Sequence, residues 1–172
     1  IDALALAKDS PTVMWMEGET RHMLVNSDGD FQSIRFRSNG FRLGVDRRFG
    51  DVVVGAAAGY SDGNLHTTDR SNEATAKGLH LGLYGLADFD GVMLTGGWTW
   101  SRYKVNGDRI VDYGSITESL DSRWTGKAHR LFAEVGHAFG KPQLQIEPFV
   151  GLSYATLKAS GFEETGGDAA LQ

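Results

Sequence analysis

Few residues in this sequence have the types and spacing that chemistry at a metal or cofactor site requires. The chain has five histidines and no cysteine, which excludes thiolate metal sites, thiolate nucleophiles and a disulfide scaffold. His80 lies on the more polar side of an alternating run and has no second histidine at ligand spacing, so we expect it to be structural. Asn26–Asp30 (NSDGD) resembles the start of a calcium loop, but Phe31 and Arg37 stand where that loop needs glycine and glutamate. We expect a plain turn there and no bound metal or cofactor.

The sequence also carries no motif that supports nucleophilic catalysis. Gly151–Ala155 (GLSYA) nearly matches the serine-hydrolase elbow, but it lies within an alternating run and not at a strand-to-helix turn. Other polar residues could form a carboxylate–histidine cluster at a strand end, but they match no catalytic motif: Asp62, His66, Asp69, Asp121, Arg123 and His129. We therefore expect that the chain is not an enzyme.

Length and composition predict one domain with no nucleic-acid partner. The chain has 172 residues, of which 41% are hydrophobic and 23% charged, and its net charge is −5. Its basic residues are scattered and form no stripe that would fit a nucleic acid. The 23 glycines accompany only 3 prolines and fall inside apolar runs, as strand glycines do. No apolar run approaches the roughly 18 residues of a membrane helix.

The elements that would position any site are alternating β-strands. In Gly40–Tyr60, apolar residues such as Phe41, Leu43 and Val45 alternate with a second set of residues. This second set includes charged residues in one strand and consists almost entirely of glycine and alanine in the next. A soluble sandwich would spread ordinary polar residues over its outer face. A face with Arg42 and Asp46 in one strand and glycine in the next favours a membrane barrel with lipid outside and a polar lumen inside.

Similar runs predict further strands and connections of alternating length. The strands are expected over 12–19, 31–48, 52–60, 75–89, 92–101, 122–139 and 143–154, with an eighth starting at 169. A change of phase near Ser38–Gly40 predicts a bulge in the second strand. The predicted long loops are 21–30, 61–72, 106–121, where Ile110 and Tyr113 suggest a projecting hairpin, and 161–168. Tight turns at one end and long loops at the other are typical of bacterial outer-membrane barrels.

The alternation assigns residues to the two faces of the predicted barrel. The lumen-facing set is Arg42, Asp46, Gly55, Gly59, His80, Gly82, Arg130, Glu134 and Glu147. Glycines on that face allow another backbone to approach closely, or they relieve curvature and accommodate large lumen side chains. Aromatic residues on the apolar phase near loop ends predict an interfacial girdle: Trp15, Tyr60, Trp98, Trp100 and Tyr154.

The order of the segments resembles the translocator β-domain of autotransporters, the type V secretion proteins of Gram-negative bacteria. The resemblance covers residues 12–172 and rests on Met14–Trp15, Gly40–Arg48, Val54–Gly55, Gly59–Tyr60, Gly82–Gly85, Phe132–Gly136, Glu147–Phe149, Leu152–Tyr154 and Gly161–Gly167. It implies an all-β, antiparallel, 12-stranded transmembrane barrel in the outer membrane that exports an N-terminal passenger. Residues 1–11 would then be the end of the linker or a short helix in the lumen, and 12–172 part of the barrel.

The same resemblance implies partners and leaves alternatives. The partners would be outer-membrane lipids, the chain's own passenger and linker segment, and the barrel-assembly machinery. The sequence stops as an eighth strand begins, so we expect about seven or eight of the family's strands and a fragment of the barrel. The alternatives are a small structural outer-membrane barrel of eight strands, a barrel enzyme and a soluble lipocalin-like carrier.

Overall fold

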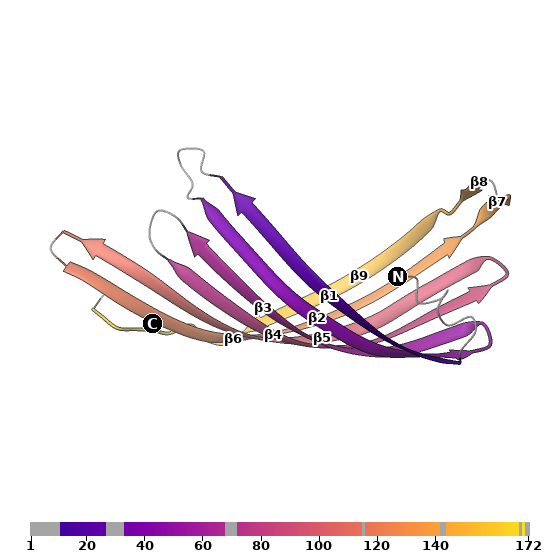
Figure 1. Ribbon diagram of the computed structural model, residues 1–172, viewed down its shortest axis with the longest axis horizontal. Helices are drawn as coiled ribbons and strands as arrows, with labels where there is room; N and C mark the ends of the chain where they lie inside the picture. The colour runs from indigo at the N-terminus through magenta and orange to yellow at the C-terminus, as the bar shows by residue number, and fades with distance from the viewer. Residues whose placement is uncertain are drawn as a thin grey trace.

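The chain forms a curved, open antiparallel sheet (Figure 1). The computed structural model describes residues 11–26, 33–67, 72–114, 116–141, 144–168 and 170. Its main strands are β1 (Thr12–Val25), β2 (Ile34–Phe49), β3 (Val52–Thr67), β4 (Glu73–Phe89), β5 (Val92–Tyr113), β6 (Ile116–His137) and β9 (Phe149–Ala159). Three short strands complete it: β7 (Phe139–Lys141), β8 (Leu144–Ile146) and β10 (Glu164–Thr165).

Consecutive strands are neighbours throughout the main sheet. β1 to β6 pair in chain order, and β9 and β10 pair with successive parts of β6, while β7 and β8 form a separate two-stranded unit. This up-and-down order confirms the predicted all-β fold class with seven to eight strands. Among the described residues, no helix has the length and hydropathy needed to cross a membrane. The short helix expected within 1–11, the turn within 26–30 and most of the strand expected at 169–172 lie outside the described residues.

The strands extend further toward one end of the sheet than the sequence predicts. A membrane-crossing strand needs about 9 to 11 residues, whereas β5 and β6 have 22 residues each. The predicted loop over 61–72 is wrong for its first part, because β3 continues to Thr67, and β1 likewise runs through part of the loop expected over 21–30. The hairpin predicted within 106–121 is confirmed, with Gly114 at φ +67° in its turn. Polar stretches become strands here because backbone pairing continues beyond the apolar part of each strand.

The bulge predicted near Ser38–Gly40 is absent. The pairing of β2 with β3 runs without interruption from Ile34 opposite Thr67 to Phe49 opposite Val52. Ile34 therefore shares a face with Arg42 and not with Phe41. On the face that carries Phe41, the side chains of β2 change from apolar to charged toward Arg35, while the pairing register stays constant. This change of residue type produces the apparent change of phase.

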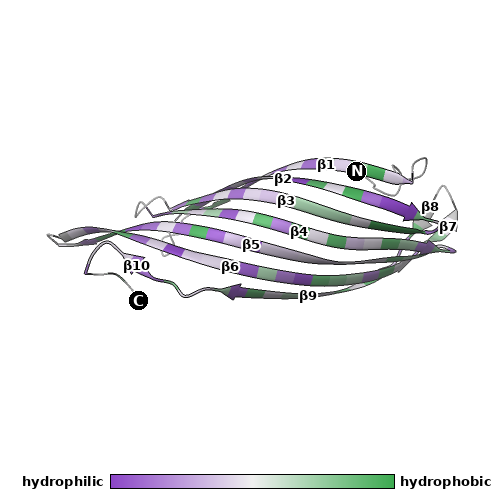
Figure 2. Ribbon diagram, turned by 90° about the horizontal axis from the view of Figure 1, so that it is seen from below, coloured by the Kyte–Doolittle hydropathy of each residue, from purple (hydrophilic) through white to green (hydrophobic). Residues whose placement is uncertain are grey.

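The register divides the sheet into two chemically different faces, and Figure 2 shows hydrophobic and hydrophilic residues alternating along the strands. We call the face with Arg42, Asp46 and Tyr84 the polar face, and the face with Leu43, Leu83 and their partners in register the apolar face. Apolar side chains are largely exposed, with Leu83 56% and Leu152 81% accessible. Among the described residues, only Val53 and Leu120 are buried hydrophobic side chains. The side chains of the apolar face are therefore not packed in a protein core, and this face is suited to an apolar environment.

Candidate functional site: the polar face of the sheet

The structure brings the predicted lumen-facing residues onto one face of the sheet. Three sets of residues lie opposite one another on neighbouring strands of this face: Arg42, Gly59 and His80; Asp46 and Gly55; and Gly82, Thr99 and Arg130. Glu134 is opposite Gly151 on the same face, and Glu147 Oε1 would lie 3.3 Å from a Cβ added at Gly136. The structure therefore places these residues on one face of the sheet. That this face lines a lumen remains a prediction.

A hydrogen-bonded cluster on this face links three strands. The indole Nε1 of Trp15 on β1 donates to Asp46 Oδ1 on β2 at 3.2 Å and contacts the hydroxyl oxygen of Tyr84 on β4 at 3.0 Å. The Tyr84 hydroxyl in turn donates to Asp46 Oδ1. Asp46 is 1% exposed, and both donors reach Oδ1 while Oδ2 is buried without a hydrogen-bond partner among the described residues, so these donors offset only part of its desolvation. The cluster fixes the mutual positions of β1, β2 and β4.

Two glycines leave room for the rings of this cluster. Tyr84 crosses the intervening strand β3 above Gly55, where an added Cβ would lie 2.3 Å from the tyrosine ring. The Trp15 ring covers Gly44, where an added Cβ would lie 2.4 Å from it. Glycine is therefore required at both positions by the close approach of a ring. The sequence allows two explanations for glycines on this face, close approach of another backbone or accommodation of large side chains. At Gly44 and Gly55 the glycine accommodates a large side chain.

The prediction that Trp15 belongs to an aromatic girdle on the apolar face is wrong. Trp15 is opposite Gly44 and bonds to Asp46, so it lies on the polar face. Its phase could not be read from the sequence, because the long connection between β1 and β2 leaves their register open. The other four girdle residues lie on the apolar face, with Tyr60 opposite Leu79, Trp98 opposite Leu131, Trp100 opposite Leu81 and Tyr154 opposite Leu131. Their place at a membrane interface remains a prediction.

A second polar cluster lies further along the same face and includes His80. The ring contacts two hydroxyls, with Nε2 2.8 Å from Ser61 Oγ and Nδ1 2.8 Å from Ser101 Oγ. A catalytic serine–histidine pair needs a carboxylate at the second nitrogen, to orient the ring and stabilise its charged form. A serine takes that place here, so the contact cross-links β3, β4 and β5. This pairing could not be predicted from the sequence, since the partner serines are 19 and 21 residues away.

Charged side chains continue the polar face beside His80. The guanidinium of Arg42 lies 3.1 Å from Glu19 and 3.4 Å from Glu17. All three side chains are at least 31% exposed, so the ion pairs contribute little stability. They present hydrated charges of both signs on this face.

Beyond the apolar part of the strands, the segment after β9 folds onto the β5–β6 hairpin. Glu164 in β10 accepts two hydrogen bonds from Arg109, at 3.1 Å and 2.7 Å, and its side chain is 4% exposed. Leu120, opposite Arg109, is fully buried. Gly166 has φ +120°, and an added Cβ would lie 2.3 Å from the carbonyl oxygen of Ser119. This latch, formed by Arg109, Glu164 and Gly166, joins the projecting hairpin to the chain that follows β9.

The opposite face of the hairpin carries a pair of carboxyl groups. A hydrogen bond shared with Asp121, opposite Asp108 in the register, is the main cause that raises the pKa of Asp108; slight desolvation of this exposed carboxyl and like-charge repulsion by Asp121 add to it. A raised folded-state pKa means that the contribution to stability is full below the ordinary value of 3.8 and is lost as pH rises through the raised pKa.

We therefore expect the hairpin to open more easily at neutral pH than below pH 3.8, where Asp108 is protonated in both the folded and the open hairpin. Amide hydrogen exchange of residues 106–123, corrected for its intrinsic pH dependence, should become faster as Asp108 ionises. Asp121→Asn should remove this dependence, because an amide can donate to the ionised Asp108 without repelling it. An unchanged dependence in that variant would contradict the assignment. The effect should be modest, since both groups are exposed.

This chain is similar in sequence and in fold to known proteins. The model of the autotransporter beta-domain family matches residues 14–172. Two proteins of Serratia marcescens, each called extracellular serine protease, are 31% identical over 134 and 138 residues. The match covers 77% of this chain but only 13% of each relative. The translocator domain of the autotransporter NalP from Neisseria meningitidis shares the fold, with a TM-score of 0.76 and 18% identity over 92% of this chain and 54% of that one.

Proposed function

The chain belongs to the autotransporter β-domain family, the outer-membrane translocators of type V secretion, and from this premise we propose that its polar face lines the path of an N-terminal passenger. The observation that carries the proposal is the division of the sheet into an exposed apolar face and a polar face. On the polar face, glycines accommodate rings, and charges of both signs remain hydrated. In a barrel, lipid-facing and lumen-facing residues alternate in this way.

The domain itself is proposed to do no chemistry. The word protease in the names of the Serratia relatives describes proteins of which this chain matches 13%. We assign any such activity to the exported part and not to the translocator. What supports this division on the polar face is that the ring nitrogens of His80 contact two serine hydroxyls.

The proposed partners follow from the same division of faces. Lipid of the outer membrane would cover the apolar face, and Tyr60, Trp98, Trp100 and Tyr154 would lie near its interfaces. The chain's own passenger and linker would contact the polar face. The barrel-assembly machinery is proposed as the third partner, because in lipid the backbone groups of every strand must be paired and an antiparallel sheet satisfies them only as a closed barrel.

Crosslinking from neighbouring residues of one strand tests the proposal. A photoreactive amino acid replaces Thr99, on the polar face of β5, or Trp98, on its apolar face, in the full-length protein. During export we expect crosslinks to the passenger from position 99, because only that side chain faces the proposed path. Position 98 is the matched control and should crosslink to lipid. Passenger crosslinks of equal yield from both positions would contradict the proposal.

A further inference from the structure

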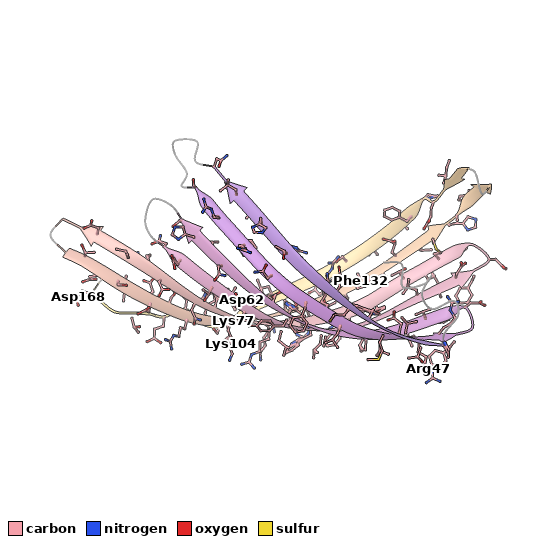
Figure 3. All side chains as sticks on the ribbon, viewed as in Figure 1. Arg47, Asp62, Lys77, Lys104, Phe132 and Asp168 are labelled. Carbon is pink, nitrogen blue, oxygen red and sulfur yellow. The ribbon has the colours of Figure 1, made fainter. Side chains whose placement is uncertain are left out.

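The apolar face ends in lysine and arginine on four neighbouring strands. On this face, each of four strands has a basic residue as its first charged side chain between the apolar residues and the hairpin end of the sheet. These residues are Lys77 on β4, Arg102 on β5, Lys127 on β6 and Lys158 on β9. Lys104 follows on β5, directly opposite Lys77. Figure 3 shows Lys77 and Lys104 close together on the convex side of the sheet. We call these five residues the basic rim.

The register places like charges of the basic rim directly opposite one another. Arg102 is opposite Lys127, and Lys127 is opposite Lys158, so three cations form one row across β5, β6 and β9. Opposed like charges destabilise neighbouring strands. Arginine and lysine rows of this kind are relieved when an anion lies between the side chains.

The described residues do not supply that anion. None of the five cations lies within 4.0 Å of a carboxylate oxygen in the described part of the chain. Asp62 is opposite Lys77 without forming an ion pair with it. The next acidic residues, Glu73 and Asp108, are four residues further out, about 13 Å along their strands at 3.3 Å per residue. The row Arg102–Lys127–Lys158 therefore remains uncompensated.

The position of the basic rim identifies the class of anion. Trp100 and Leu79 are the last apolar residues inward of Arg102 and Lys77 on the same face. A ligand at the basic rim is thus continuous with the region assigned to lipid, where long basic side chains reach the headgroup level. The basic rim lies toward the long β5–β6 hairpin, and the longer connections of outer-membrane barrels are extracellular. We therefore propose that the basic rim binds the phosphate groups of anionic lipid headgroups in the outer leaflet. This deepens the proposed function, since it rests on lipid covering the apolar face.

Lipid titration of the full-length protein in detergent micelles tests this site. The probes are lipid A with two phosphates, phosphatidylethanolamine, inorganic phosphate and soluble polyphosphate, with binding followed by native mass spectrometry. The double variant Lys127→Gln, Lys158→Gln is compared with Arg35→Gln, Arg37→Gln. The second variant removes two exposed cations on the same face of the sheet from β2, which lies four strands from β6 and five from β9. Heat-modifiable gel mobility selects folded preparations of each variant before titration.

We expect lipid A to bind the Lys127, Lys158 variant about 30-fold more weakly than the wild type, since each basic residue near the surface contributes about fivefold. The Arg35, Arg37 variant should bind as the wild type does. Equal affinity of the two variants would overturn the proposal, as would binding of phosphate or polyphosphate as tight as that of lipid A. Parallel loss of phosphatidylethanolamine would also overturn it. The crosslinks from positions 98 and 99 report on export separately, so failure of either proposal can be recognised.

Discussion

Gly55→Val is expected to prevent assembly of the cluster that links β1, β2 and β4. An added Cβ would lie 2.3 Å from the Tyr84 ring and 2.4 Å from Asp46 Oδ1, so the tyrosine could not cross β3. The variant would lose the bonds to a buried carboxylate and acquire steric strain, with an expected cost of about 3 to 5 kcal/mol. Urea unfolding of the full-length protein in vesicles measures this cost, and surface export of the passenger should fall with it.

Gly82→Val is the matched control for this experiment. Gly82 lies on the same face, in β4, but an added Cβ there would make only ordinary contacts, the nearest at 3.6 Å from Thr99. We expect a change of less than about 1 kcal/mol, since valine suits a strand. If the two variants were equally destabilised, loss of glycine on this face in general, and not the crossing of Tyr84, would be the cause.

Arg109→Ala is expected to release the segment after β9 from the projecting hairpin. The substitution removes a two-bond guanidinium partner from a carboxylate whose side chain is 4% exposed. Amide exchange of residues 161–168 should accelerate on the order of tenfold or more, because the latch must then open without its charge-assisted bonds. Arg109→Lys should give an intermediate rate, since lysine cannot make both bonds in the same geometry.

Arg123→Ala is the control for the latch. Arg123 lies on the other face of the same hairpin, opposite Asn106, is exposed, and makes no ion pair with the described residues. Its removal should leave exchange in 161–168 unchanged. Wild-type rates in Arg109→Ala would show that the backbone pairing of β10, with Gly166 against Ser119, holds the segment without the ion pair.

The sequence by itself determined the fold class and the two faces of most strands. A period of two is a local property, so residues joined by tight turns, such as Arg42 and Gly59 on either side of Phe49–Asp51, could be assigned to one face by counting. The same counting places Trp98 and Trp100 with the apolar residues. The family resemblance rests on this order of segments, and the match over residues 14–172 confirms it.

Only the tertiary structure decided which residues meet across long connections and where the strands end. Trp15 could not be placed opposite Gly44 from its own strand, because the connection after Val25 leaves the register free. Polar residues such as Asp62 and His66 continue β3 because a strand ends where backbone pairing ends and not where hydrophobicity ends. The Tyr84–Asp46 bond, the latch and the row of cations from Arg102 to Lys158 depend on register over several strands, which no local pattern contains.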